Sequence, residues 1–468
     1  MSRLKSKSFC LLGFSALSLV VNSCKTIDKE DSKPNVLLLL ADDLGYGELG
    51  CYGQKQIKTP VLDSLAKKGV RFTQFYAGNA VCAPSRASLI TGKHPGHCTI
   101  RGNAGLYKEQ QWDRVPLKKE EATIGEVMKT AGYQTAFIGK WHVEHPNDLS
   151  TWAFARGFDF AVQPQWSSPQ GGDQYDERVH WINNKEDSLV YDAQKYDCID
   201  VFRTNIAIDY LKKKKEDQAF FLFMSYRIPH ARENYIRDTL LYANKNWPET
   251  ERIHAARITL LDSEIGRLLN YLERTGELDN TLVLFTSDNG AHGEGGHSHA
   301  FFQSTGQLRG YKRDLYEGGI RVPALAYWKG KIQAGSTSNH MAAFWDIMPT
   351  LTDLTGTQKP KQTDGISFLP EMLNQEQKKH DYLYWEVQLK GKRAKLNGGY
   401  RQALRKGEWK AVRYGINNLT ELYNLKLDPF EQKNLAKEYP QKVDTLNSLL
   451  KEAHTETDHF PYGGLQNN

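Results

Sequence analysis

One cysteine stands at the start of a predicted helix, in a position that suits covalent chemistry. Cys82 lies in the segment VCAPSRASLITG, residues 81–92. Pro84 suits the first turn of a helix, and Gly92 suits its end. Unpaired N–H groups at a helix N-terminus favour anions and lower the pKa of a thiol. We therefore predict an acidified thiol beside an anion site, although a small buried cysteine would have the same local sequence.

Polar residues follow four predicted buried strands at the point where each strand ends. The apolar runs are 35–41, 133–139, 219–224 and 281–286. Helical segments separate them, which indicates an α/β fold whose parallel strands end along one edge of the sheet. The residues predicted to converge at that edge are Asp42, Asp43, Lys140, His142, His230, Asp288 and Asn289.

The acidic members of this set could hold a cation. Asp42, Asp43, Asp288 and Asn289 offer hard oxygen ligands, which Ca²⁺ and Mg²⁺ prefer. No histidine adjoins either acidic cluster at strand-end spacing, so zinc is the less suitable ion. We predict calcium, because its larger shell tolerates an amide oxygen and bidentate aspartates. Lys312 adds a cation beside the predicted anion site.

The elements divide the chain into two structural regions. Its 468 residues are 40% hydrophobic, which predicts one large domain and a smaller one. We place the first, an α/β domain, at 34–350 and the second, a small α+β subdomain, at 351–468. The helices predicted in the first are 60–68, 84–91, 123–131, 200–215 and 255–274. The second has predicted strands at 382–387, 400–405 and 408–414, and the segment 421–425 and a helix at about 440–454 complete it.

Charge and cysteine content exclude several functions. The net charge of +6 is spread along the chain, and the dense run 212–215 is typical of a solvated helix end, so nucleic acid is not an expected partner. Beyond residue 24 the cysteines are too few and too dispersed for a disulfide scaffold, and no C-x-x-C pair indicates a zinc ribbon or thioredoxin site.

The N-terminus has the organisation of a secretion signal over residues 1–23. Basic residues precede the apolar run 9–21, which is too short to span a bilayer permanently. The sequence VNSC at 21–24 is similar to the lipobox of bacterial lipoproteins, which implies a lipidated Cys24 and a place in the bacterial cell envelope. The polar tether 24–33 follows, so only the lipid would contact the membrane. The asparagine is unusual in that box, and plain secretion is the alternative.

Taken together, the motifs resemble those of type I sulfatases, the formylglycine-dependent family, and among them bacterial lipoprotein arylsulfatases and N-acetylgalactosamine sulfatases. The resemblance covers nearly all of the chain after the tether. It implies an alkaline-phosphatase-like α/β sandwich with a large, mostly parallel mixed sheet and a C-terminal antiparallel sheet. The matching segments, in order, are Asp42-Asp43, 82–92, 139–142, 229–230, 288–290, 308–323 and 421–435.

The resemblance implies a sulfuric ester hydrolase and assigns roles to its residues. A maturation enzyme would oxidise Cys82 to formylglycine, one hydroxyl of whose hydrate attacks sulfur while the other later expels sulfate. A histidine would protonate the leaving alcohol. The implied Ca²⁺ ligands are Asp42, Asp43, Asp288, Asn289 and the modified Cys82. The groups implied to hold the hydrate are Arg86 and Lys140, and those implied to contact sulfate are His142, His230 and Lys312.

The expected substrate is a sulfated saccharide, from host or algal glycans. Segments 94–103 and 293–302 resemble sulfatases that act on galactose or N-acetylgalactosamine, which implies exo-acting removal of a 4- or 6-sulfate. The segments 143–146 and 161–168 depart from the family pattern, and these loops bear on the substrate rather than on the chemistry. Candidate contacts to sugar hydroxyls are Arg101, Asn103, Asp173 and His297, each of which could instead make a structural hydrogen bond.

Two other functions fit part of the sequence. A phosphodiesterase or phosphotransferase of the alkaline phosphatase superfamily would have this fold, but would use serine or threonine and two zinc ions. Cys82 and the pair Asp288-Asn289 count against it. An inactive, glycan-binding surface lipoprotein is the second alternative. It is disfavoured because every catalytic residue type is present.

Overall fold

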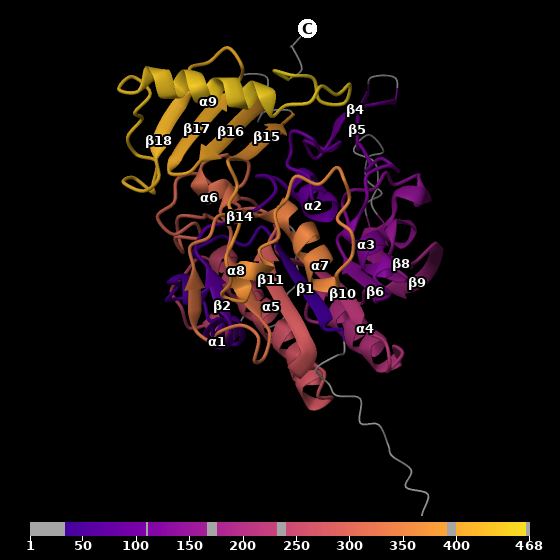
Figure 1. Ribbon diagram of the computed structural model, residues 1–468. Coiled ribbons are helices and arrows are strands. Elements are labelled where there is room, and N and C mark those ends of the chain that lie inside the picture. The colour runs from indigo at the N-terminus through magenta and orange to yellow at the C-terminus, as the bar shows by residue number, and fades with distance from the viewer. Residues whose placement is uncertain (1–32, 109–110, 166–175, 232–239, 391–398, 465–468) are drawn as a thin grey trace, which may run out of the picture. The chain divides into compact units, whose positions relative to one another are not determined.

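The computed structural model describes residues 33–108, 111–165, 176–231, 240–390 and 399–464. Residues Pro34–Asn468 form one compact unit, drawn as a ribbon in Figure 1. The predicted signal and lipidation site Cys24 lie outside the described residues. Within the described part of the chain, no helix combines the length and apolar character needed to cross a membrane.

A mixed sheet of ten strands forms the centre of this unit. Its middle strands β11, β1, β10, β6 and β7 are parallel, and antiparallel pairs extend the sheet on both sides. The sheet and its parallel centre confirm the predicted fold class. Across the sheet the strands are β13 (Ser336–Ser338), β2 (Val70–Phe72), β12 (Ala324–Tyr327), β11 (Thr281–Ser287), β1 (Asn35–Asp42), β10 (Phe220–Pro229), β6 (Gln134–Gly139), β7 (Phe160–Gln165), β8 (Asp176–Ile182) and β9 (Lys185–Val190).

Helices cover both faces of the sheet because β1 is apolar on both sides. Val36, Leu38 and Leu40 pack in the core that includes α2, α3 and α7, whereas Leu37 and Leu39 pack in the core that includes α1, α4 and α5. Strands with two buried faces need this sandwich. The helices are α1 (Pro60–Lys68), α2 (Cys82–Thr91), α3 (Ile124–Thr130), α4 (Ile199–Lys213), α5 (Glu249–Arg274), α6 (Glu317–Ile320), α7 (Ile347–Thr355), α8 (Leu369–Met372) and α9 (Pro440–Glu452).

The helix α5 begins earlier than the sequence pattern predicted. Its first turn starts at Glu249 after Pro248, six residues before the predicted start at 255. Proline before acidic residues is a helix start signal, so this end of α5 could have been found from the sequence. The difference is relevant to function, because the added turns lie beside the candidate active site.

An antiparallel sheet forms the C-terminal region, as predicted, and β18 adds a fourth strand to the three that the sequence indicated. α9 lies across one face of this sheet (Figure 1), where Leu446 and Leu450 pack on it. The other face packs against residues of the α/β domain such as Tyr76 and Trp345. The predicted boundary at 350 falls inside α7, which packs against α2. The strands are β15 (Leu383–Gln388), β16 (Tyr400–Lys406), β17 (Trp409–Tyr414) and β18 (Glu421–Asn424).

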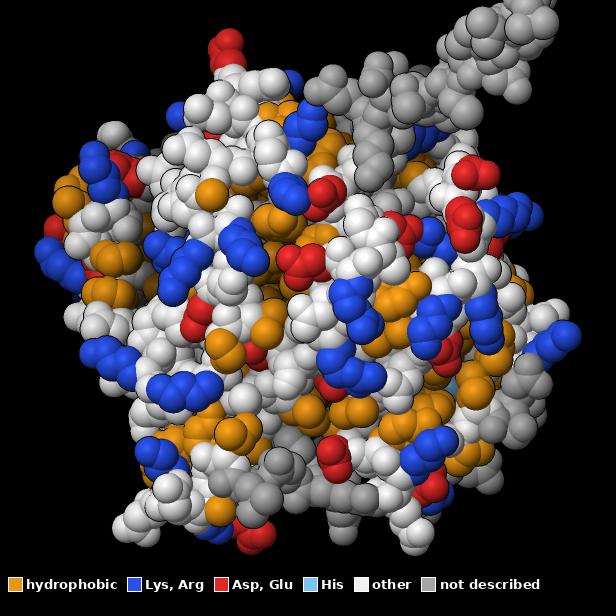
Figure 2. Space-filling model, turned by 90° about the horizontal axis from the view of Figure 1, so that it is seen from below, with side chains coloured by type: hydrophobic (Ala, Val, Ile, Leu, Met, Phe, Trp, Pro, Cys, Tyr) orange, Lys and Arg blue, Asp and Glu red, His pale blue; other side chains and the backbone are white. Residues whose placement is uncertain are grey.

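Two short ribbons complete the described strands. They are β3 (Phe75–Tyr76) with β14 (Ala342–Ala343), and β4 (Gly105–Tyr107) with β5 (Gln111–Asp113). On the face seen from below (Figure 2), Lys and Arg side chains are interspersed with Asp and Glu. This face therefore carries no single basic stripe among its described residues.

Candidate active site

The ends of the central parallel strands bring the predicted acidic residues together. Asp42 ends β1 and pairs in register with Pro229 of β10. Asp43 has a φ of 68°, in the left-handed region that residues with a side chain seldom adopt. Its N–H donates to Asp288 Oδ1 at 3.0 Å, just beyond the end of β11. The neighbours Asp42 and Asp43 therefore meet Asp288, 245 positions from Asp43, at one sheet edge.

α2 presents Cys82 to the same edge. Cys82 is the first residue of α2, Pro84 lies in the first turn, and Gly92 ends the helix with a φ of 70°. The Cys82 Sγ atom lies 3.6 Å from Asp42 Oδ1. The predicted acidification is wrong, because burial raises the pKa of the Cys82 thiol to about 12 despite two nearby lysines. An unmodified thiol here is poorly suited to attack.

Arg86 of α2 contacts three strands or their ends: β10, the end of β6 and the end of β11. Its Nε and one terminal nitrogen donate to Asp288 Oδ2 at 3.0 and 2.8 Å. The other terminal nitrogen donates to Lys140 O and to Ser225 Oγ, both at 2.6 Å. The guanidinium is buried, and a buried charge needs such partners. Arg86 therefore positions Asp288 and the end of β6, and its implied contact with the modified cysteine stays a prediction.

Two cations hold the carboxylate of Asp42. Lys140 Nζ donates to its two oxygens at 3.0 and 2.7 Å, and Arg227 donates to Oδ2 at 2.9 Å. Burial alone would raise the pKa of Asp42. The charges of Lys140, His230, Arg86 and Arg227 instead hold this pKa well below its usual value. Asp42 is therefore ionised. The pKa of Asp288 is instead raised to about 7, by burial and by the charge of Asp42.

Lys312 and Asn289 hold Asp43. Lys312 Nζ donates to Asp43 Oδ2 at 2.6 Å, and Asn289 Nδ2 donates to Asp43 Oδ1 at 2.7 Å. The Asp43 carboxylate raises the pKa of Lys312, outweighing the opposite effect of burial. Lys312 is therefore a fixed positive charge at the position where the sequence predicted a sulfate contact.

The donor set fits a hard divalent cation. One oxygen each of Asp42, Asp43 and Asp288 lie within 4.8 Å of one another, and all three residues are buried. The buried Asn289 Oδ1 has no hydrogen-bond partner among the described residues. Amide oxygen and nitrogen have nearly the same shape, so exchanging them would turn this oxygen toward Asp43. Three carboxylates and an amide oxygen suit Ca²⁺.

Two histidines border these residues. His230 Nε2 lies 3.8 Å from Asp43 Oδ2, at the sheet edge where it was predicted to converge with the acidic residues. Its Nδ1 lies 2.8 Å from Ala231 O. His142 follows β6 with a φ of 64°. Burial, with nearby cations, lowers the pKa of both imidazoles. Left-handed backbone at a residue other than glycine often marks a functional position.

The site carries more positive than negative side chains. Four carboxylates, Asp42, Asp43, Asp288 and Glu294, face five cations among the described residues, so the formal excess is one positive charge. A divalent cation would raise that excess to three. Such a site favours an anionic substrate and can stabilise charge that develops during its cleavage. The five cations are Arg86, Lys140, Arg227, Lys312 and Arg313.

Two residues of this site were not singled out from the sequence. Arg227 and Ser225 both lie in β10 and contact Asp42 and Arg86, respectively. Asp200 holds the end of this strand by accepting from the N–H groups of residues 227 and 228. Arg227 stands three residues before His230 at a predicted strand end, which is the signal that could have identified it.

The predicted sugar contacts do not all lie at the site. Asn103 is exposed, and its Oδ1 accepts from Ala83 N at 3.1 Å, next to Cys82. Arg101 is buried and binds Glu386 of β15 at 2.5 Å. It also donates to Cys98 O and Gly96 O. This placement favours a structural role for Arg101. Asp173 lies outside the described residues.

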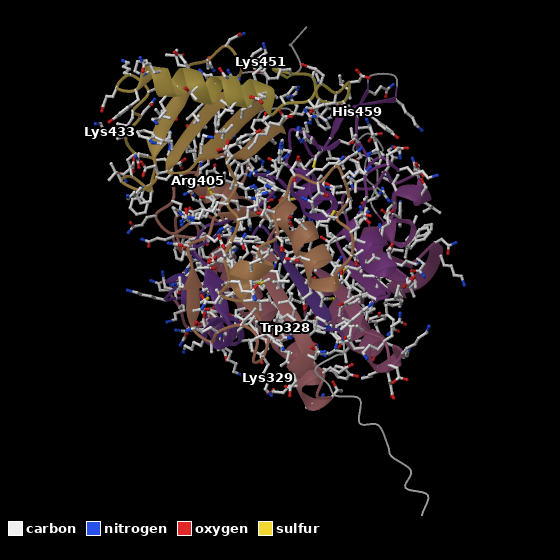
Figure 3. The ribbon with its side chains drawn as sticks, in the orientation of Figure 1. Trp328, Lys329, Arg405, Lys433, Lys451 and His459 are labelled. Atoms are coloured by element: carbon white, nitrogen blue, oxygen red, sulfur yellow. The ribbon has the colours of Figure 1, made fainter. Side chains whose placement is uncertain are left out.

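We expect Arg101→Ala to destabilise the protein. Breaking a buried ion pair completely costs about 3–5 kcal/mol. The loss here should be smaller, because the Glu386 carboxylate would keep its hydrogen bonds to Tyr384, Tyr400 and His454. Urea unfolding should show this loss. Lys433→Ala is the control, because Lys433 lies at the edge of the C-terminal region (Figure 3). Its ion pair with Glu438 is exposed, so its removal should leave the urea midpoint unchanged. A raised KM for saccharides with unchanged stability would instead support a sugar contact for Arg101.

His297 lies in a cluster of imidazoles and carboxylates. Its Nδ1 atom lies 2.6 Å from Glu251 Oε2, at the N-terminal end of α5. His254 Nε2 lies 2.6 Å from Glu48 Oε1, and Glu48 also accepts from Gly45 N at 2.7 Å. The cluster thus supports the loop that follows Asp43.

The comparisons with known proteins define the class. The sequence profile described as Sulfatase matches residues 34–357, and the profile described as N-sulphoglucosamine sulphohydrolase, C-terminal, matches residues 309–458. The chain belongs to the sulfatase family. The family is one of sulfuric ester hydrolases.

Relatives and solved structures agree with this class. The chain is 30% identical to human N-acetylgalactosamine-6-sulfatase over 73% of this chain and 66% of that protein. It is 27% identical to N-acetylglucosamine-6-O-sulfatase of Bacteroides thetaiotaomicron over 95% and 90%, respectively. Over 90% of this chain and 93% of the other, it is similar to the structure of Ps i-CgsB with k-i-k-neocarrahexaose, with 25% identity and a TM-score of 0.77. The chain spans about two thirds of the human relative's length.

Proposed function

We propose that this protein hydrolyses sulfate esters of sugars, with formylglycine formed from Cys82 and with Ca²⁺. One observation carries the proposal: Cys82 starts a helix directly beside three carboxylates that four cations surround. Asp42, Asp43, Asp288 and Asn289 would hold the ion, which would polarise the sulfate oxygens. Formylglycine would supply a hydrated aldehyde with two hydroxyl groups at the same position.

The side chains of the site have separable tasks in this reaction. Lys312 and Lys140 place positive charge where the sulfate oxygens would gather charge in the transition state. Arg86 fixes the positions of Asp288 and β6. His142 or His230 would donate a proton to the leaving alcohol oxygen, a contribution of about 10²–10⁴-fold in rate. Burial excludes water from the carboxylates and strengthens the electrostatic interactions of these charges.

Turnover of paired chromogenic substrates tests the reaction class. We expect hydrolysis of an aryl sulfate to exceed that of the matching aryl phosphate. Preference for the phosphate would favour the phosphoryl-transfer alternative, and inactivity on both, together with glycan binding, would favour an inactive lectin-like protein. The maturation enzyme must be present in the expression host, because the proposal requires conversion of Cys82.

For the substrate, we propose an exo-acting enzyme on a terminal galactose or N-acetylgalactosamine 4- or 6-sulfate. The human relative's name supports this choice, while the Bacteroides relative is named for N-acetylglucosamine. A panel of galacto- and gluco-configured monosaccharides sulfated at positions 2, 3, 4 and 6 tests it. Preference for a glucosamine sulfate, or for internal sulfates of long chains, would contradict the substrate but not the reaction.

We further propose that Cys24 anchors the enzyme in the bacterial cell envelope through a lipid. Cys24→Ser should move the protein from the membrane fraction to the soluble fraction, because the lipid on Cys24 would be its sole attachment to the membrane. Fractionation followed by immunoblotting measures the change. Cys51→Ser serves as the control, since Cys51 lies after the tether in the folded unit. A wild-type protein that is already soluble would contradict the anchor.

A further inference from the structure

A buried carboxyl group lies two residues after His142. Glu144 has an exposed fraction of 1%, whereas His142 keeps part of its surface accessible. The Oε1 atom of Glu144 accepts a hydrogen bond from a terminal nitrogen of Arg114 at 3.4 Å. Its Oε2 atom has no hydrogen-bond partner of good geometry among the described residues. A buried carboxyl group held this loosely contributes little to stability, so a role in the neighbouring site is the better reason for it.

The loop after β6 is held on both sides of His142. Before it, Arg86 donates to Lys140 O at 2.6 Å, and after it the N–H of Leu117 donates to Val143 O at 3.1 Å. Between these two contacts, His142 has a φ of 64°. A left-handed residue other than glycine is strained and persists only where its surroundings hold it. The side chains packed on this loop therefore decide where the imidazole lies.

The carboxyl group of Glu144 is one of the groups packed on this loop. Burial raises its pKa, and Arg114 opposes that rise together with the N–H groups of residues 142, 143 and 144. These N–H groups therefore lie close to the carboxyl group. Successive N–H groups around a left-handed residue form a concave site for an anion, and here the chain's own carboxyl group occupies it. Replacing Glu144 would release the backbone that carries His142.

The ribbon of β4 and β5 brings the partner of Glu144 to this loop. Arg114 directly follows β5, and Asp113, the last residue of β5, has its Oδ2 atom 3.7 Å from His145 Nε2. Two adjacent residues of the ribbon thus contact the loop. Burial lowers the pKa of His142, and Arg114 is the strongest of the cations that lower it further. Arg114 therefore lies near the imidazole as well as near the carboxyl group.

We propose that Glu144 and Arg114 are positioning residues, whose ion pair holds the loop after β6 so that the imidazole of His142 faces the sulfate group. This inference rests on the proposed sulfatase function and adds two residues to the reaction it describes. Glu144 acts through His142 and not on the substrate, because almost none of its surface is accessible. The departure of the segment 143–146 from the family pattern would then affect the chemistry as well as the substrate.

Glu144→Gln tests the ion pair with little change in shape. The amide keeps an oxygen for Arg114, but it removes the charge and places N–H donors against the N–H groups of the loop. The measured quantities are kcat and KM for 4-nitrophenyl sulfate, with the conversion of Cys82 determined by mass spectrometry in each variant. We expect kcat to fall roughly 10–100-fold and KM to change less than about twofold, because a small misplacement of a reacting group mainly slows the chemical step. Glu144→Asp, which keeps the charge, should restore part of the loss.

The same substitution in a His142→Gln background separates positioning from stability. There Glu144→Gln should change kcat by less than about twofold, because residues that act as one unit have non-additive effects. Glu121→Gln is the matched control. Glu121 is also buried, its carboxylate lies 3.4 Å from Lys93 Nζ, and it accepts from two backbone N–H groups. The control substitution should lower the melting temperature and leave kcat unchanged.

Four results would overturn the positioning role. They are an unchanged kcat in Glu144→Gln, an equal loss of kcat with and without the imidazole of His142, a similar loss in Glu121→Gln, and a raised KM with unchanged kcat. The last would indicate that Arg114 contacts the substrate directly. In each case hydrolysis of 4-nitrophenyl sulfate by the wild type would leave the proposed function standing. A mature wild type that cleaves no sulfate ester would overturn both proposals.

Discussion

Cys82→Ala is expected to lose essentially all sulfatase turnover while the fold stays intact. Loss of a covalent nucleophile costs on the order of 10⁴-fold or more in kcat. The side chain lies in a buried position at the start of α2, and alanine suits a helix, so the stability change should be only about 1 kcal/mol. Turnover of an aryl sulfate and thermal unfolding measure the two effects.

Mass spectrometry of the Cys82 peptide completes this test. In the conversion the CH₂–SH group becomes CH=O, so active wild-type protein should lose sulfur and gain oxygen there. Cys198→Ala is the matched control, a buried cysteine at the start of α4 that should keep full turnover. An active preparation with a homogeneous free thiol at Cys82 would contradict the mechanism, since burial keeps that thiol protonated.

Asp288→Ala should lose the metal ion and activity together. Elemental analysis of active wild type should find about one calcium ion per chain. The alanine variant leaves Arg86 buried without its carboxylate, so Asp288→Asn, which keeps the volume, is the cleaner test. Calcium affinity from isothermal titration should fall by more than the roughly 10–100-fold that loss of an outer-shell partner costs.

The control for this experiment is Asp262→Asn. Asp262 is also buried and accepts two backbone N–H groups of α1, at 2.8 and 3.0 Å. Its replacement should lower stability and leave one calcium ion in place. Two zinc ions in active wild-type protein would instead favour the phosphoryl-transfer alternative.

The sequence alone determined the elements that build the site. The continuous apolar run that became β1 predicted a strand buried on both faces, and alternation with helices predicted the parallel sheet. Parallel strands end at one edge, so the convergence of Asp42, Asp43 and Asp288 followed from topology. The proline and glycine around Cys82 predicted α2, because each has a backbone preference that acts locally.

Only the tertiary structure decided which charges pair and which atoms are buried. Lys312 and Asp43 are 269 positions apart, and no local pattern links them. Helix geometry predicted an acidic Cys82 thiol, but the surrounding protein removed it from water and raised its pKa. Arg101, in the loop after α2, pairs with Glu386 of β15, 285 positions along the chain. Pairing and desolvation depend on side chains that other elements bring close, and this information is absent from local sequence.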